Sequence, residues 1–455
     1  MYRLAWFSPL LDAGCSPSRS TLSGAFTREL LPILEHDIDV EIFVDDSDLE
    51  KHGEYWRPGP EREREFPIFH FHRAFERHRN NPFDAFIYHL EDHPRCNYVA
   101  LSQARYPGIT YLHDCAFSQL YLARYRHSTG AGDIDELMDG HFGTRSARLG
   151  SLHVRGWSNA VFDKIYPFNK DVLAAGTIFV VPYSSFASLL APLTQAPCHV
   201  SGVPLRLHTT SSGTILHAQR AMLGISLRQP VIGFAGSHFL HDRIPDVLEA
   251  FGVLCARGKA SPKKAEDAPI LLWLFAPPEA ETIVERSAIS EADRNNIRFF
   301  RPVPGQNVEG LYTVLTAFVS PRSDTRRGVL PQAWSALASG TPTILPDHGP
   351  SAEIPPGAAM HVDMGSAFVS SLAYTLEEIL QNSRLRSLLK ERANAYIRDV
   401  CAPDCIWKDL VCILEASHSR LREECARMDS LYFRTRRSLI EKAAYGGRGF
   451  GESRA

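Results

Sequence analysis

The sequence lacks three features that would assign a protein class at once. Its most apolar run, ILLWLFA at 270–276, is far too short to span a bilayer. Its 49 Lys and Arg nearly balance its 52 Asp and Glu, so no global positive field draws it to nucleic acid or an anionic membrane. Its N-terminus, MYRLAWFSPLL, has no basic region followed by a long apolar one, so we interpret it as a first strand and not as a signal peptide.

Cysteine and histidine are present but follow no ligand or disulfide pattern. The nine cysteines are an odd number scattered from Cys15 to Cys425, which predicts neither a disulfide framework nor a zinc ribbon. Cys401 and Cys405 have no second Cys or His pair at ligand spacing, so we interpret them as reduced thiols. FHFHR (69–73) is interpreted as a half-exposed strand. We therefore expect a cytoplasmic, reducing environment, no metal ion and no cofactor.

A strand, turn and helix pattern occurs twice in the 455 residues, a length that favours two or three domains. Apolar runs predict buried strands in the first half at 3–9, 39–46, 83–90, 108–114 and 176–184. The pattern restarts at Pro230, with strands expected at 230–237, 269–278, 297–303, 315–324 and 341–347. Helical spacing lies between them, as at 22–34, 244–258 and 330–340. This alternation predicts an α/β protein with two parallel sheets, each covered by helices on both faces.

We accordingly divide the chain into two doubly wound, Rossmann-like domains at 1–215 and 216–400, C-terminal helices at 401–445 and a disordered tail at 446–455. The segment 186–229, with several Pro, Ser and Thr, is the expected interdomain connection. Ligands of such sheets bind outside the carboxyl ends of the strands. Two facing sheets would therefore enclose a cleft suited to joining two substrates. Periodicity alone fits epimerases, binding proteins and dehydrogenases equally well.

Two segments of the N-terminal half carry candidate binding residues. The small-residue loop of SPLLDAGCSPSRS (8–20) precedes a helix, and backbone N–H groups at Gly14, Cys15 and Ser16 could hold an anion or a sugar hydroxyl. In ITYLHDCAF (109–117), His113 and Asp114 directly follow a strand. An imidazole there can donate to a hydroxyl or accept its proton, and an adjacent carboxylate can tune it. The alternative for His113 is a cap on the next helix.

Two further segments lie in the C-terminal half. In GFAGSHFLHDRIPDVLEAF (233–251), Gly236 and Ser237 precede Arg243 at a helix start, an arrangement that suits a diphosphate. The alternative is a surface arginine beside a helix cap. In SPRSDTRRG (320–328), three arginines surround Asp324. The three are Arg322, Arg326 and Arg327. They are either a cationic cluster that binds a ligand or charged residues of a solvated loop.

Together these segments resemble family 4 glycosyltransferases, which have the GT-B fold. The resemblance includes RELLPILEHDIDVEIFVDD (28–46) and ASGTPTILPDHGPSAEI (338–354). It implies retaining transfer from a nucleotide sugar without a bound metal. His113 would then lie at the reacting end of the donor sugar, and Arg243 takes the position of the family's phosphate-binding lysine. The loop around Gly14 would face the donor phosphates and the acceptor.

The chain departs from this family at a pair of glutamates. The family carries two, with seven residues between them, the first on the donor sugar and the second on the ribose. Counted back from Gly340, these positions hold Arg327 and Ser335. Asp324 could replace the first, and Ser335 or Gln332 could make the ribose contact. The family usually has an arginine after the glycine that corresponds to Gly236, and this chain has Ser237 there. Glu353 matches a family glutamate that either binds the ligand or supports the structure.

The leading interpretation is a cytoplasmic glycosyltransferase that builds a bacterial surface polysaccharide, lipid-linked glycan or glycoprotein. The nucleotide sugar would occupy the C-terminal domain, and a glycan, lipid-linked or protein acceptor the N-terminal one. A rival is a noncatalytic, degenerate GT-B protein that acts as partner or scaffold of an active glycosyltransferase. The missing glutamates favour the rival, while His113 and Arg243 argue against it. The N-terminal match argues against a GT-B epimerase. Peripheral membrane contact and a homo-oligomer stay open.

Overall fold

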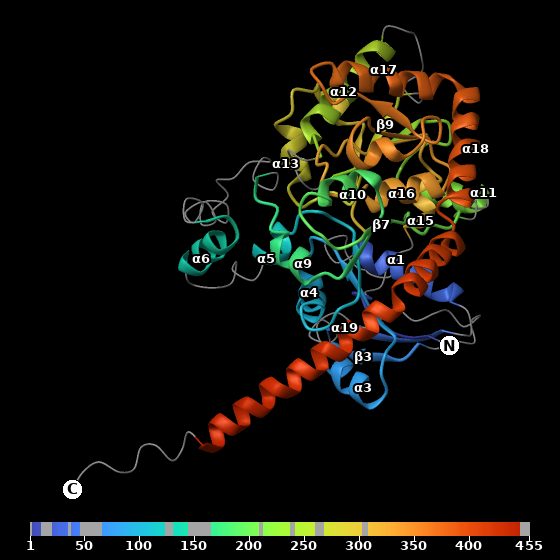
Figure 1. The fold of residues 1–455 in the computed structure, drawn as a ribbon. Coiled ribbons are helices and arrows are strands. Elements are labelled where there is room, and N and C mark those ends of the chain that lie inside the picture. Colours follow the sequence, from blue (N-terminus) through green and yellow to red (C-terminus); the bar gives the residue numbers. More distant parts are fainter. Residues whose placement is uncertain are drawn as a thin grey trace.

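The computed structural model describes residues 2–10, 21–34, 38–45, 66–122, 131–143, 165–208, 213–236, 242–259, 268–302 and 308–445. These residues form two parallel β-sheets covered by helices, one built from each half of the chain (Figure 1). The prediction of two parallel α/β sheets is therefore confirmed. The predicted disordered tail, 446–455, lies outside the described residues.

The first sheet has, within the described residues, seven parallel strands in the order β3-β2-β1-β4-β5-β6-β7. Its central strands are buried on both faces, as their continuous apolar runs predict. The strands are β1 (Tyr2–Phe7), β2 (Ile38–Val44), β3 (Ile68–His70), β4 (Ala85–Leu90), β5 (Ile109–Leu112), β6 (Ile178–Val181) and β7 (Cys198–Val200).

The second sheet has, in the part of the chain that the structure describes, six parallel strands in the order β10-β9-β8-β11-β12-β13. All five strands expected here are present, and β13 is an additional edge strand. The strands are β8 (Val231–Ala235), β9 (Ile270–Leu274), β10 (Ile297–Phe300), β11 (Ala317–Val319), β12 (Thr343–Pro346) and β13 (Met360–Val362).

Helices connect successive strands of both sheets. Those of the first half are α1 (Leu22–Leu30), α3 (Ala74–Asn80), α4 (Asn97–Gln103), α5 (Ser118–Leu122), α6 (Ala131–Phe142), α9 (Lys170–Ala175) and α10 (Ser184–Leu190). Those of the second half are α11 (Gly213–Met222), α12 (Ile244–Lys259), α13 (Ala280–Glu285), α14 (Glu291–Arg294), α15 (Glu309–Tyr312), α16 (Pro331–Ala338), α17 (Phe368–Gln381), α18 (Ser383–Asp399) and α19 (Pro403–Tyr445).

Helix α1 begins at a side-chain cap and presents one apolar face to the first sheet. The Thr21 hydroxyl accepts a hydrogen bond from the Gly24 N–H at 3.0 Å, which satisfies a free donor of the first turn. Phe26 and Leu30, four residues apart, are buried against the sheet. Gly24 has no room for a side chain, because an added Cβ would overlap the Pro9 carbonyl oxygen. Helix α1 is thereby held close to the loop that follows β1.

The expected connection at 186–229 is more ordered than the sequence predicts. It contains most of α10, the edge strand β7 and helix α11. Because β7 pairs with β6, part of this segment belongs to the first sheet, and its role as the interdomain connection stays a prediction. A strand of three half-buried or exposed residues leaves no apolar run to detect.

Helix α19 returns to the first sheet after the second sheet is complete. Ile406, Trp407, Leu410 and Leu414 are buried in one hydrophobic cluster with Trp6 of β1. Figure 1 shows the C-terminal end of α19 extending away from the body of the protein. No helix in the described ranges is both long enough and apolar enough to cross a membrane.

Candidate functional site between the two sheets

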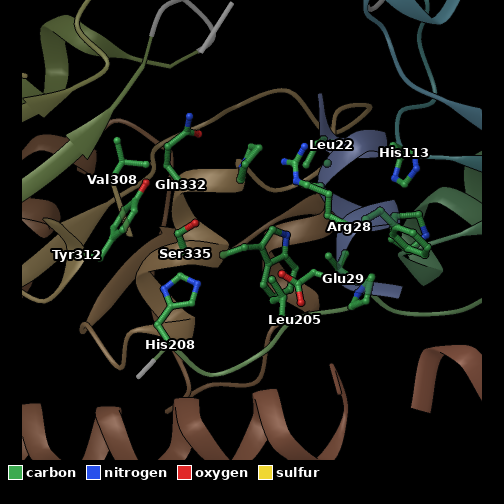
Figure 2. Close-up of a pocket in the computed structure, with 18 of the residues that line it drawn as sticks. Leu22, Arg28, Glu29, His113, Leu205, His208, Val308, Tyr312, Gln332 and Ser335 are labelled. Atoms are coloured by element: carbon green, nitrogen blue, oxygen red, sulfur yellow. The ribbon is translucent and has the colours of Figure 1, made fainter. Parts of the chain in front are cut away.

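A cavity lies between the sheets, beside the carboxyl ends of strands from both (Figure 2). It contains about 1200 Å³ of empty space, including its opening to solvent. The first sheet contributes His113 after β5 and Tyr183 after β6, and the second contributes Phe275 after β9. Helix α1 lines one side and helix α16 another. The cavity is therefore where parallel strands of this arrangement bind ligands.

His113 is the strand-end residue that the sequence places at this cavity, and the structure brings it there. Its backbone N–H donates to the Leu90 carbonyl at 2.8 Å, which continues the pairing of β5 with β4. Its ring lies edge-on to Phe26, with centroids 5.2 Å apart. Burial lowers the pKa of His113 to about 3, so the ring is neutral at physiological pH. No helix cap by His113 is present among the described residues.

The Asp114 carboxylate is bound by backbone groups, and its influence on His113 stays a prediction. Its two carboxylate oxygens accept hydrogen bonds from the backbone N–H groups of Asp92, at 2.9 Å, and Gly328, at 3.1 Å. The carboxylate is thus held by the backbone of both halves of the chain. Burial is the cause of the lowered pKa of His113.

Arg327 forms a buried ion pair across the two halves of the chain. Its Nη2 lies 2.5 Å from Oδ2 of Asp92, in the loop after β4. Its Nε lies 3.2 Å from Oδ2 of Asp324 in its own loop. The backbone at Asp114 and Arg327 pairs as an isolated antiparallel bridge, and the Cys115 N–H donates to the Arg326 carbonyl at 2.8 Å. The position expected for a sugar-binding glutamate therefore carries a cation that joins the two halves.

Comparison with known proteins finds similarity in structure. No protein-family model matches the sequence, and no curated protein matches it. Sucrose-phosphate synthase from Thermosynechococcus elongatus is 13% identical, with 92% of this chain and 100% of that chain covered and a TM-score of 0.59. WaaG, a glycosyltransferase involved in lipopolysaccharide biosynthesis, is 14% identical over 89% and 98% of the chains, with a TM-score of 0.54. HepE from Anabaena, solved in complex with UDP-glucose, is 11% identical over 91% and 100%, with a TM-score of 0.57.

The chain has the GT-B fold. At identities of 11–14% this likeness is one of fold. The predicted fold class is confirmed, whereas membership of family 4 and the domain boundaries stay predictions.

Asp324 does not line the cavity of this GT-B chain. Its Oδ1 accepts a hydrogen bond from the backbone N–H of Arg326 at 3.0 Å, and its Oδ2 faces Arg327. Arg322 pairs with Asp242 instead, at 3.3 Å. Two members of the predicted cationic cluster thus pair with different acids, Arg322 with Asp242 and Arg327 with Asp92 and Asp324. A contact between Asp324 and a sugar stays a prediction that this arrangement does not support.

Arg243 precedes helix α12 as expected, but its guanidinium is directed within its own half of the GT-B fold. It donates to Oδ2 of Asp246 and to the Met364 carbonyl, both at 2.6 Å, and lies 4.2 Å from the centre of the Phe368 ring. Its φ of 44° is a conformation that non-glycine residues rarely adopt. Arg243 is not among the residues that line the cavity, and its diphosphate contact stays a prediction.

The glycine loops are only partly described. Gly236 follows β8, and its carbonyl accepts a hydrogen bond from Nε1 of Trp273 at 3.0 Å. A Cβ at this position would lie 2.9 Å from the Asp242 Cβ, so glycine permits a close approach of the backbone. Four predicted binding residues lie outside the described residues. They are Ser237 and, in the first loop, Gly14, Cys15 and Ser16.

Gln332 and Ser335, the two candidates for ribose contact, line the cavity from helix α16. In Figure 2 they lie on the side of the cavity opposite His113, near Tyr312 and His208. Oε1 of Gln332 is buried and has no hydrogen-bond partner among the described residues. A buried acceptor without a partner is costly. This oxygen is not exposed to the cavity, so a ligand hydroxyl would reach it only after the Gln332 side chain rotates.

Glu353 makes structural contacts in this arrangement, one of the two roles that the sequence left open, and its ligand binding stays a prediction. Its carboxylate accepts hydrogen bonds from the backbone N–H groups of Ser184, at 2.6 Å, and Ser185, at 2.8 Å. These donors are the free N–H groups of the first turn of α10. Because Glu353 lies in the second half and α10 in the first, the contact joins the two halves.

No group of three or more His, Cys, Asp or Glu side chains in the described ranges is arranged to bind a metal ion. Metal independence stays a prediction of the sequence.

Proposed function

We propose that the chain is a retaining glycosyltransferase that transfers sugar from a nucleotide sugar to a glycan, lipid-linked or protein acceptor in bacterial surface-glycan assembly. The observation that carries the proposal is the cavity lined by His113, which follows β5 of the first sheet, and by Gln332 and Ser335 of helix α16 in the second half. The likeness in fold to HepE, solved with UDP-glucose, and to WaaG, involved in lipopolysaccharide biosynthesis, supports it.

The ribose and the sugar would lie at different ends of this cavity. The Ser335 hydroxyl, and the Gln332 amide after its side chain rotates toward the cavity, can hydrogen-bond ribose hydroxyls on the α16 side. The donor sugar would then extend toward His113. Arg28 of α1 also lines the cavity, and Arg243 stays the predicted diphosphate ligand. Such cations stabilise the charge that develops on a departing diphosphate.

Front-face transfer requires no strong base from the protein, because the leaving phosphate itself takes the proton of the acceptor hydroxyl. A histidine with a pKa of about 3 has little basicity at physiological pH. The neutral ring of His113 suits this mechanism, since it can hydrogen-bond a ligand without exchanging a proton.

Release of nucleoside diphosphate from a series of nucleotide sugars, with and without acceptor glycans, tests the proposal. We expect one donor to be turned over, and a Gln332→Ala, Ser335→Ala double variant to require a higher donor concentration. Absence of turnover with every donor and acceptor class would contradict the transferase assignment.

A noncatalytic partner of an active glycosyltransferase is the second candidate. The observation that favours it is the Arg327–Asp92 ion pair, which occupies the position where the resemblance requires an acid. A scaffold would form a complex with an active glycosyltransferase and change that enzyme's rate. Donor turnover by the isolated chain would exclude it.

A further inference from the structure

Two histidines lie in contact directly behind the cavity. His89 belongs to β4, and His113 follows the neighbouring strand β5. Nδ1 of His89 is 3.2 Å from Nε2 of His113, a hydrogen-bond distance. His113 lines the cavity, whereas His89 is fully buried. His89 therefore reaches the cavity only through His113.

Both rings are neutral. Burial lowers the pKa of His89 well below its usual value, and the neighbouring His113 adds to this effect. The rings of Trp6 and Tyr111 lie 4.8 and 4.9 Å from His89, centroid to centroid. A neutral imidazole has one N–H donor and one acceptor nitrogen, so one of the two histidines donates and the other accepts.

The surroundings of His89 decide which ring donates. Its Nε2 is buried and has no hydrogen-bond partner among the described residues. If the proton were on Nε2, a donor would be left unpaired in an aromatic environment, and unpaired buried donors are rare. The Tyr111 ring is within 5° of parallel to the His89 ring, so its face does not receive an N–H in the plane of His89. The rings of Trp6 and Phe26 are tilted and could offer an N–H on Nε2 only a weak contact with an aromatic face. On Nδ1 the proton has a nitrogen acceptor at 3.2 Å, so we place the proton of His89 on Nδ1.

We propose that His89 is a positioning residue that donates from Nδ1 to Nε2 of His113 and so fixes the proton of His113 on its own Nδ1. If the proposed function holds, His113 then donates a hydrogen bond to an oxygen of the donor sugar or its phosphate. It accepts no proton during transfer, because its acceptor nitrogen is already occupied. The sequence left open whether His113 donates or accepts a hydrogen bond, and its contact with His89 favours the role of hydrogen-bond donor.

Nitrogen NMR of the full chain labelled with ¹⁵N-histidine measures the tautomer directly. Signals of His113 are identified by their loss in His113→Asn. We expect an unprotonated, hydrogen-bonded Nε2 and a protonated Nδ1 for His113 in the parent. In His89→Phe, which keeps an aromatic ring but has no donor, we expect the Nε2 signal to change. A protonated Nε2 in the parent, or an unchanged His113 spectrum in His89→Phe, would overturn the proposal.

A matched pair of substitutions tests the consequence for ligand binding. The amide of His113→Asn can donate from near the position of Nδ1, whereas that of His113→Gln reaches toward Nε2. We expect His113→Asn to keep most of the parent's affinity for the nucleotide sugar, and His113→Gln to lose about tenfold, the value of a neutral hydrogen bond. Equal losses in two variants that melt alike would contradict the donor role. If the parent binds no nucleotide sugar, the proposed function fails, while the NMR spectrum still decides the tautomer.

Discussion

Arg327 lies between carboxylates from both halves of the chain, and all three side chains are buried. Its relative exposure is 8%, against 4% for both Asp92 and Asp324. Water therefore screens these charges little, and each depends on the others for compensation.

Replacing Arg327 by methionine should destabilise the fold by about 3–5 kcal/mol, because two buried carboxylates lose their cation. Chemical denaturation of the parent and variant measures the loss. Arg420→Ala is the control, since Arg420 pairs with Glu424 on the exposed face of α19 and such pairs contribute about 0–1 kcal/mol. Equal, small effects of the two substitutions would contradict the role of Arg327.

Glu91 gives the fold a pH dependence with a defined sign. Burial, together with the charge of Asp114, raises its pKa from 4.5 to about 8. Between these two pH values the folded state keeps the proton on Glu91, whereas the unfolded state has released it. The contribution of Glu91 to the free energy of unfolding is therefore full below about pH 4.5 and decreases as the pH rises toward 8.

We expect the melting temperature of the parent to decrease as the pH is raised from about 4.5 to about 8. The melting temperature of Glu91→Gln should decrease less over the same range. The glutamine keeps a carbonyl oxygen that can accept the Ser23 N–H, now 2.9 Å from Glu91 Oε2. Parallel melting curves for parent and variant across this pH range would show that Glu91 does not titrate in this way.

Substitution of Arg243 distinguishes a ligand-binding role of this residue from a structural one. If it binds the donor diphosphate, Arg243→Ala should lower nucleoside-diphosphate affinity about ten- to hundredfold, the value of a charge-assisted pair. Calorimetric titration of a folded variant measures this. Unchanged affinity with a lowered melting temperature would leave Arg243 only its contacts with Asp246, Met364 and Phe368.

Local sequence was sufficient to find residues at strand ends and insufficient to find their partners. His113 was predicted because it directly follows an apolar run. His89 lies inside such a run and gave no signal beyond an ionisable residue among apolar ones. Arg327 and Asp92 are 235 positions apart, so no spacing within one motif could reveal their ion pair.

At the scale of elements, run length determined which strands the sequence could predict. Strands such as β4 and β9 are continuous buried runs. The edge strands β7 and β13 have three residues each and are not fully buried, so their pattern is too short to detect. The contact of α19 with the first sheet was also missed, because its apolar spacing does not show which sheet it covers.

Helix α19 should contribute to the stability of the first sheet through its buried residues, which extend from Ile406 to Cys425, and not through its exposed C-terminal turns. Leu410 is buried against that sheet, and Leu410→Ala should cost about 2–5 kcal/mol. Leu431, on the same helix, is 56% exposed, and Leu431→Ala should change stability by less than about 0.5 kcal/mol. Denaturation of both variants tests this; similar losses would mean that the C-terminal end of α19 is packed in solution.

At the scale of the whole molecule, the cavity is bounded by two sheets that several polar contacts join. Arg327 with Asp92, Gly328 with Asp114, and Ser184 with Glu353 each connect one half to the other. These contacts hold the two halves of the chain together beside the cavity.

The most direct test of the account is calorimetric titration of nucleotide sugars into the parent and a variant with the cavity filled. Ser335→Phe places a large side chain in the cavity lining, and Ser370→Phe places the same side chain at an exposed position on α17. We predict that one nucleotide sugar binds the parent and Ser370→Phe alike, and that Ser335→Phe does not bind it. Equal binding by all three proteins, or no binding by the parent, would contradict a donor site between the two sheets.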